Sequence, residues 1–261
     1  MKIRIPAGIL AALLFLAAGC ATQDRSPDGA TSATTGVSGR ATVFAAASLT
    51  ESFNGIAELF KAANPETELT FNFGPSSGLA TQILEQGGAD VFASADQTNM
   101  EKVSADDLID GDPQVFARNV LQIIVAPGNP KGIRTLSDLA NPDLKVVLAA
   151  AQVPVGRYAR QALDKAGVTV NPVSEAVDVK GVVGPVTLGE ADAGVVYATD
   201  VRAVGSRAAG IEIPEQHNVE AEYPIGVVGG ADNPEVARAF VDFVLSRQGR
   251  EVLSEHGFLD P

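Results

Sequence analysis

The sequence predicts an α/β protein with two lobes, each a mixed, mostly parallel sheet flanked by helices, and a ligand cleft between the lobes. Short apolar runs alternate with helical stretches along most of the 261 residues, which is typical of parallel sheets covered by helices. One longer β-rich run, residues 115–126, interrupts this alternation before it restarts. We interpret that run as a strand that crosses between lobes. Clefts between lobes are common binding places for small ligands.

The predicted strands are short runs rich in Val, Phe and Ala. A continuous apolar run is typical of a strand that is buried on both faces. The runs are residues 41–45, 68–73, 90–93, 115–126, 146–149, 194–197 and 223–228.

The predicted helices follow from apolar residues at helical spacing and from end signals. The first opens at Ser48, carries Phe53, Ile56 and Phe60 on one stripe, and ends before Pro65. The others are residues 77–86, 97–103, 157–165, 180–188, a helix that begins at Pro234, and 248–256. The chain crosses near residue 116 and returns near 218–223, which predicts one lobe from residues 41–116 and 223–261 and a second from residues 117–222.

The first 20 residues are predicted to be a signal peptide. Lys2 and Arg4 precede the apolar stretch 9–18, which is too short to span a bilayer as a helix. The stretch ends in Ala-Ala-Gly-Cys, which resembles the lipobox of bacterial lipoproteins and implies lipidation of Cys20, the single cysteine. The alternative is an ordinary secretory signal with an incidental cysteine. Residues 21–40 lack apolar periodicity and are predicted to be a flexible tether.

Composition excludes several classes of function. The net charge is −13, from 19 Lys plus Arg against 32 Asp plus Glu, which disfavours binding to nucleic acid or to an anionic membrane surface. One Cys and two His exclude an intrachain disulfide and leave little for a zinc site or a catalytic triad. We interpret His217 and His256 as surface residues.

Candidate binding residues lie where short strands end in small residues and helices begin. Helix N-termini expose unpaired N–H groups and a partial positive charge, so several aimed at one point bind an anion. The segments are residues 43–50, 73–78, 153–156 and 178–181. Each has a purely structural alternative, because Ser48 with Glu51 fits a capping box and Ser76 or Ser77 fits a plain N-cap. Tyr197 ends an apolar strand, and its hydroxyl needs a partner if it is buried.

These segments resemble the periplasmic molybdate-binding proteins of ABC transporters. The resemblance covers residues 41–261. It is carried by V-F-A-A-A-S-L-T (43–50), S-S-G-L-A-T-Q-I (76–83), D-V-F-A-S-A-D-Q (90–97), V-P-V-G-R-Y-A (153–159), G-V-V-Y-A-T-D (194–200), Y-P-I-G-V-V (223–228) and H-G-F (256–258).

The resemblance implies a type II periplasmic binding-protein fold and a set of hydrogen-bond donors to molybdate oxygens, with no direct metal ligand. Hydroxyl and N–H donors would come from Ser48 and Ser76, backbone N–H donors from Val155 and Val179, and a phenolic O–H from Tyr197. Whether Ser76 or Ser77 is the donor stays open, because this chain has Gly-Pro at 74–75 where many relatives are rich in serine.

The implied function is an exported, monomeric receptor without a cofactor, held at the membrane by lipid only. It would capture molybdate or tungstate by lobe closure and deliver it to a membrane permease with a separate ATPase chain. A donor-only site suits a fully deprotonated oxyanion, whereas monohydrogen phosphate needs an acceptor, which the matched positions lack.

Two alternatives remain open at the level of sequence. A sulfate or small organic anion receptor keeps the fold, although Arg157 and Arg160, the nearby candidates to clamp a carboxylate, fit a solvated helix face. A secreted hydrolase would use Ser48 as nucleophile and needs a neighbouring base.

Overall fold

The computed structural model describes residues 36–261. The predicted signal peptide, Cys20 and residues 21–35 of the predicted tether lie outside the described residues. Strand β1 begins at Gly39, so the end of the range predicted as tether already belongs to the sheet. Among residues 36–261, no helix has both the length and the apolar character that crossing a membrane requires.

Nine strands form the sheet of the described part. They are β1 (Gly39–Ala46), β2 (Thr67–Gly74), β3 (Val91–Ala93), β4 (Ile109–Val125), β5 (Val146–Ala149), β6 (Ser174–Ala176), β7 (Ala193–Tyr197), β8 (Ala209–Glu212) and β9 (Glu220–Val228). Their order is β2-β1-β3-β9-β4-β7-β5-β6, with β8 paired to β4.

The helices lie between these strands and after the last one. They are α1 (Thr50–Ala63), α2 (Ser76–Gln86), α3 (Gln97–Ser104), α4 (Pro154–Lys165), α5 (Lys180–Thr187), α6 (Ala198–Val204), α7 (Pro234–Leu245) and α8 (Arg247–Glu255). Short 3₁₀ turns span Ala47–Leu49, Leu136–Ala140 and Gly205–Arg207.

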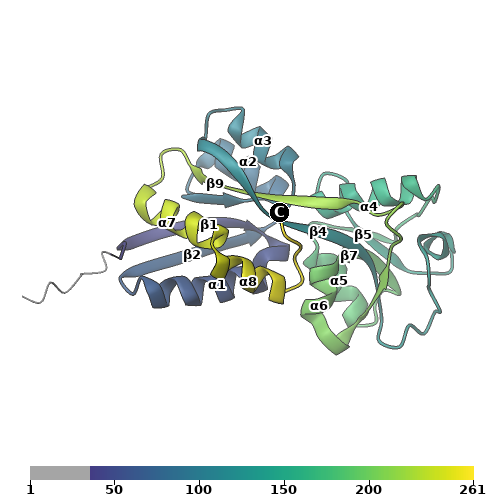
Figure 1. The fold of residues 1–261 in the computed structure, drawn as a ribbon. Helices are drawn as coiled ribbons and strands as arrows, with labels where there is room; N and C mark the ends of the chain where they lie inside the picture. The colour runs from purple at the N-terminus through teal and green to yellow at the C-terminus, as the bar shows by residue number, and fades with distance from the viewer. Residues whose placement is uncertain (1–35) are drawn as a thin grey trace, which may run out of the picture. The chain divides into compact units, whose positions relative to one another are not determined.

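Two groups of elements share the long strands β4 and β9 (Figure 1). We call β1–β3 with α1–α3, α7 and α8 the first lobe, and β5–β8 with α4–α6 the second lobe. Strand β4 pairs with β9 up to Val120 and with β7 from Leu121 onward. The predicted boundaries at 116/117 and 222/223 fall inside these two strands, and that division of the chain stays a prediction.

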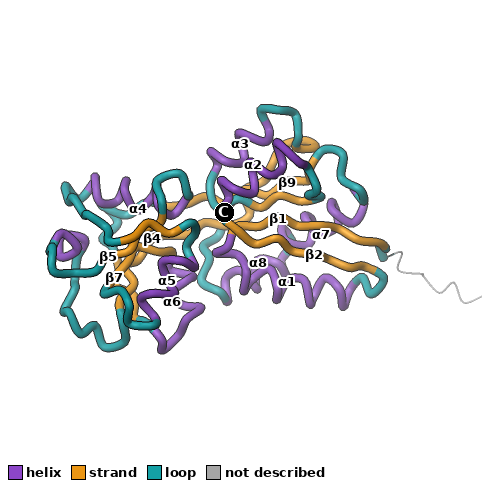
Figure 2. Tube along the Cα trace, turned by 180° about the vertical axis from the view of Figure 1, so that it is seen from behind, coloured by secondary structure: helices purple, strands orange, loops and turns teal. Residues whose placement is uncertain are grey.

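The first lobe shows why a continuous apolar run makes a central strand. Neighbouring side chains of a strand point to opposite faces. Val43 and Ala45 pack in the cluster that holds Phe53, whereas Phe44 packs with Leu79. Helices therefore cover both faces, with α2 and α3 on one side of β1 and α1 and α8 on the other (Figure 2).

Every predicted strand and helix is present, and the differences concern short elements and one strand end. Strand β6 has three residues and α6 has seven, too few for a periodic pattern. Strand β4 begins at Ile109, whereas the sequence predicted a start near 115. The earlier part was not predicted because Gly111, with φ +77°, and Pro113 interrupt the β pattern, and they lie at a register shift in the pairing with β9.

Candidate functional site

A small cavity of about 20 Å³ lies where the two lobes face each other. Its walls follow the carboxyl ends of β1, β2, β5 and β7, the edge at which open α/β sheets bind ligands. The lining residues are Ala46, Ala47, Ser48, Gly74, Pro75, Ser76, Ala95, Val153, Pro154, Val155, Asp178, Val179 and Tyr197.

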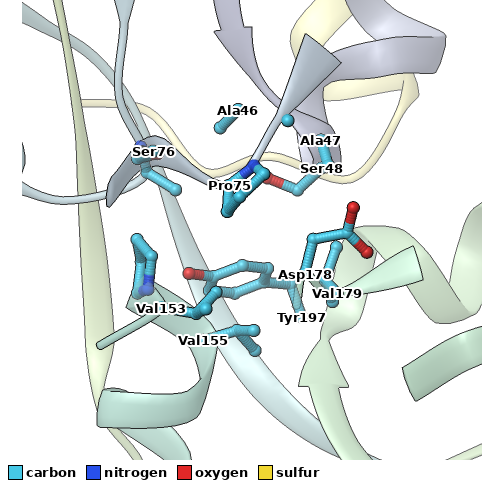
Figure 3. A pocket seen from close by; sticks show the side chains of 13 residues that line it. Ala46, Ala47, Ser48, Pro75, Ser76, Val153, Val155, Asp178, Val179 and Tyr197 are labelled. Atoms are coloured by element: carbon cyan, nitrogen blue, oxygen red, sulfur yellow. Dashed lines mark hydrogen bonds between the residues drawn. The ribbon is translucent and has the colours of Figure 1, made fainter. Parts of the chain in front are cut away.

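All five residues predicted to bind the ligand line this one cavity. Ser48 and Ser76 belong to the first lobe, and Val155, Val179 and Tyr197 to the second. Figure 3 shows the Tyr197 ring between Val155 on one side and Ser48 and Pro75 on the other. The four helix starts singled out in the sequence therefore converge on one point.

Ser76, and not Ser77, stands in the cavity wall. Ser76 is 1% exposed, and its Oγ accepts a hydrogen bond of 3.0 Å from the Ala95 N–H. The alternative of a plain N-cap is wrong, because Pro75 occupies the N-cap position of α2 and no side chain caps it. Since a backbone N–H can only donate, the Ser76 proton stays available to a group in the cavity.

Ser48 also differs from the capping-box alternative. It lies within the 3₁₀ turn Ala47–Leu49, and Leu49 takes the N-cap position of α1 without a side-chain bond. The Ser48 Oγ lies 3.0 Å from the Tyr223 hydroxyl instead. Sequence reasoning missed this contact, because Tyr223 is 175 positions away in the chain.

Three helices that begin at the cavity have no capping side chain at their N-cap position. The N-caps of α2, α4 and α5 are Pro75, Val153 and Val179, and none forms a side-chain cap bond. Side chains do cap α3 (Asp96), which begins next to Ala95 of the cavity wall, and α7 (Asn233) and α8 (Ser246), which begin elsewhere. The starts of α2 and α4 at the cavity thus retain N–H groups for an anion, whereas at α5 the preceding Asp178 already accepts from the Gly181 N–H.

The Tyr197 hydroxyl supplies a further donor. Tyr197 is 1% exposed, and within residues 36–261 its phenolic oxygen has no hydrogen-bond partner. Burial raises the pKa of Tyr197 well above its ordinary value, so the hydroxyl keeps its proton at neutral pH. Tyr197 is thus buried, and none of the residues 36–261 supplies the partner that a buried hydroxyl needs.

Asp178 is a cavity residue that the sequence analysis did not count as an acceptor. Its side chain is half-buried, and Oδ1 accepts a 2.8 Å hydrogen bond from the Gly181 N–H in the first turn of α5. In Figure 3 the carboxylate lies near Val179, toward the end of the Tyr197 side chain opposite its hydroxyl. The five matched positions hold no carboxylate, but Asp178 adds one to the cavity wall, so the exclusion of monohydrogen phosphate is weaker than the matched positions alone imply.

The two arginines expected on a solvated helix face are both engaged. Arg157 forms an ion pair with buried Asp96, and Arg160 donates to the Ala149 carbonyl oxygen at 2.7 Å and pairs with Glu175. Neither lines the cavity. A clamp for the carboxylate of an organic anion is therefore missing from the cavity wall.

No catalytic pair is assembled at Ser48 in the described part of the chain. Both histidines, which we interpreted as surface residues, are partly exposed. His256 borders a neighbouring cavity that Ser48 also lines, but its Nδ1 lies 2.9 Å from the Val252 carbonyl oxygen. Across residues 36–261, no cluster of His, Cys, Asp and Glu is arranged to hold a metal ion.

A two-lobed α/β fold with hydroxyl groups and uncapped helix ends around an interlobe cavity is the architecture of a solute-binding protein. The sequence profile of the bacterial extracellular solute-binding proteins matches residues 41–259, and the chain belongs to that family.

Individual relatives agree with this placement. The molybdate-binding protein ModA of Mycobacterium tuberculosis is 40% identical over 262 residues, covering 99% of both chains. The periplasmic molybdate-binding protein of Azotobacter vinelandii has a TM-score of 0.75 at 18% identity, over 85% of this chain and 99% of that one. The sulfate-binding protein SubI of M. tuberculosis has a TM-score of 0.77 at 17% identity, over 84% of this chain and 86% of its own.

Proposed function

We propose that this protein is an extracytoplasmic receptor for molybdate, and for tungstate of nearly the same size. The anion would be captured between the lobes and delivered to a membrane permease driven by a separate ATPase chain. The observation that carries the proposal is the convergence of Ser48, Ser76, Val155, Val179 and Tyr197 on one cavity. The full-length similarity to a molybdate-binding relative supports the same ligand.

The chemistry of the wall favours a fully deprotonated oxyanion. Such an ion accepts hydrogen bonds and donates none, so it needs hydroxyl and N–H donors. Ser76 Oγ already accepts one hydrogen bond, from the Ala95 N–H, and keeps its proton to donate, as does the Tyr197 hydroxyl. We infer that these side chains, with the N–H groups near Val155 and Val179, bind the oxygens of the anion and leave its metal atom without a protein ligand.

Sulfate is the main alternative, because it is also fully deprotonated. The fold does not separate the two ligands, since the structures of a molybdate-binding and a sulfate-binding protein match with TM-scores of 0.75 and 0.77. The 40% identity over the whole chain favours molybdate.

A calorimetric titration of residues 36–261 with molybdate, tungstate and sulfate tests the proposal. We expect one-to-one binding of the first two and far weaker binding of sulfate. Tight sulfate binding with weak molybdate binding would move the protein to the sulfate alternative, and no heat with any of the three would refute an oxyanion receptor.

Ser48→Ala tests the site itself. A hydrogen bond to a charged group contributes about 1.5–3 kcal/mol, so the variant should bind molybdate roughly ten- to a hundredfold more weakly. Ser77→Ala is the matched control, because Ser77 lies outside the cavity wall. Unchanged affinity in Ser48→Ala would remove Ser48 from the site.

The remaining expectations concern the cell and the state of the protein. We propose that it is exported, lipidated at Cys20, monomeric, and a receptor and not an enzyme. Membrane fractionation of wild type and Cys20→Ser tests the anchor: a wild-type protein released as readily as the variant would contradict it.

A further inference from the structure

The Ser48 hydroxyl is backed by a row of buried polar side chains behind the cavity. Its Oγ lies 3.0 Å from the Tyr223 hydroxyl, and Asn119 Nδ2 lies 3.5 Å from that hydroxyl and 2.9 Å from Thr199 Oγ1. All four side chains are buried, with Ser48 the most exposed at 6%. Asn119, Tyr223 and Thr199 do not line the cavity, and Ser48 is the residue of the cavity wall that Tyr223 contacts by a hydrogen bond.

The orientation of the Asn119 amide is set by the backbone. Its Oδ1 accepts a hydrogen bond of 3.0 Å from the Val120 N–H. A backbone N–H only donates, so the amide oxygen must face it and the amide NH₂ must face Thr199 and Tyr223. The reversed orientation would place two donors against each other.

The orientation of the Asn119 amide determines which group donates in each hydrogen bond from Asn119 through Tyr223 to Ser48. The amide NH₂ can only donate, so the Tyr223 oxygen accepts from Asn119. Tyr223 has one proton, which it keeps because burial raises its pKa far above the ordinary value. Among residues 36–261, Ser48 Oγ is the one acceptor within hydrogen-bond distance of that hydroxyl, so Tyr223 donates to Ser48.

The direction of these hydrogen bonds determines what the Ser48 hydroxyl can do with its proton. Its oxygen accepts from Tyr223, and no other described group takes its proton. We propose that Asn119 and Tyr223 are positioning residues that fix the Ser48 hydroxyl as a hydrogen-bond donor toward the cavity, and that they thereby select ligands that present only acceptor oxygens. This inference rests on the proposed function, because it assumes that Ser48 contacts the anion.

The arrangement at Ser76 is similar in kind. There the fixed donor is the Ala95 N–H, which occupies the Ser76 oxygen and leaves its proton for the cavity. Ser48 has no backbone N–H in this role, and the Asn119–Tyr223 pair replaces it.

A role for Tyr223 in packing alone is the competing explanation. Its ring meets Phe116, Tyr197 and Phe258 edge-on, at centroid distances of 6.3, 5.8 and 5.3 Å. Tyr223→Phe keeps this ring and removes the hydroxyl, so it separates the two roles. In this variant Ser48 is free to turn its lone pairs toward the cavity.

The experiment is a double-mutant cycle read by molybdate titration of wild type, Tyr223→Phe, Ser48→Ala and the double variant. We expect Tyr223→Phe to weaken molybdate binding about 3- to 10-fold in the wild-type background and less than about 2-fold in the Ser48→Ala background. Equal losses in both backgrounds, or no loss in the first, would overturn the proposal.

The discrimination between molybdate and phosphate is a second readout, which a loss of packing around Tyr223 would not change. Phosphate near pH 8 is mainly the monohydrogen form and is measured by competition with molybdate. The ratio of phosphate to molybdate dissociation constants should fall in Tyr223→Phe and stay at the wild-type value in Tyr158→Phe, which removes a hydroxyl from a tyrosine outside the cavity wall. A ratio unchanged in both variants would contradict a role in selection.

A second variant, Asn119→Ala, serves if Tyr223→Phe does not fold. It carries the same test, because it removes the donor that sets the direction of the hydrogen bonds and leaves the Tyr223 hydroxyl in place. A wild-type protein that binds no molybdate would refute the proposed function, whereas binding that Tyr223→Phe leaves unaltered would refute this inference alone.

Discussion

Tyr197 illustrates how a residue can oppose stability and serve binding. Its hydroxyl is buried without a partner in the described part of the chain, and an unsatisfied buried hydroxyl destabilises the folded state. Tyr197→Phe should therefore leave the free energy of unfolding unchanged or raise it, while molybdate binding weakens roughly ten- to a hundredfold. Urea unfolding without ligand and calorimetric titration measure the two effects. A less stable variant would show that the hydroxyl is satisfied within the protein.

Asp200 predicts a pH dependence of stability. It is 1% exposed, Oδ1 has no hydrogen-bond partner, and the nearest cation, Lys180 Nζ, lies 3.6 Å away. Burial raises the pKa of Asp200 from 3.8 to about 7. The folded state then binds the proton more tightly than the unfolded state, so the stability from Asp200 is present at low pH and lost as the pH rises from about 4 to about 7.

Asp200→Asn removes this titration. Relative to the variant, wild type should lose stability across that pH window, by about 4 kcal/mol at most, as the pKa difference requires. Urea denaturation of both proteins between pH 4 and 8 measures the difference. A difference in unfolding free energy that does not depend on pH, or that grows in favour of wild type, would contradict the raised pKa.

Individual residues also show what the sequence can and cannot predict. Side chains with polar chemistry next to a strand end, such as Ser48 and Ser76, are visible as candidates. Val155 and Val179 look like core residues by their side chains, because the role proposed for them uses only the backbone N–H, and they were predicted from helix starts and from the family resemblance. Asn119 was missed, although an asparagine inside a β-rich run is the signal that could have found it.

At the scale of elements, local patterns predicted most of the fold. Apolar runs and helix end signals located every strand of more than four residues, because burial on two faces leaves a strong compositional pattern. The three-residue β6 and the seven-residue α6 left no such pattern. Capping was predicted least well, because a Ser or Glu near a helix start does not show whether a distant chain segment has already engaged it.

The start of α4 gives a test of an element that positions a backbone donor. Gly156 is the third residue of α4, and a Cβ there would lie 2.1 Å from the Ala150 carbonyl oxygen and 2.5 Å from that of Ala149. The absence of a side chain lets the helix start pack directly on the end of β5, with Val155 in the cavity wall. Gly156→Ala should displace this turn.

Gly249 offers a matched control. It is the third residue of α8, where a Cβ would lie 2.3 Å from the Val244 carbonyl oxygen, and it does not line the cavity. Both Gly→Ala variants should lower the melting temperature. Molybdate affinity of the folded protein should fall only in Gly156→Ala. Equal affinities in the two variants would show that the start of α4 does not position the ligand.

At the scale of the whole described body, ion pairs join the two lobes on either side of the cavity. Lys180 of α5 contacts both carboxylate oxygens of Glu51 in α1 at 2.9 Å, and Arg157 of α4 pairs with buried Asp96 of the first lobe. Both pairs require the lobes to face each other closely. If ligand capture proceeds by closure, these pairs contribute to the closed form and vanish in the open one.

The ion pair between Lys180 and Glu51 predicts that Glu51→Gln changes the rate of molybdate dissociation. A partly exposed ion pair contributes about 0.2–1 kcal/mol, so its loss should speed molybdate dissociation by about 1.5- to 5-fold, with a smaller difference at high salt. Glu68→Gln is the matched control, because its 2.7 Å pair with Arg40 joins β1 and β2 within the first lobe. Stopped-flow displacement at low and high ionic strength measures both variants. Equal dissociation rates for Glu51→Gln, Glu68→Gln and wild type would mean that the pair does not hold the lobes together around the anion.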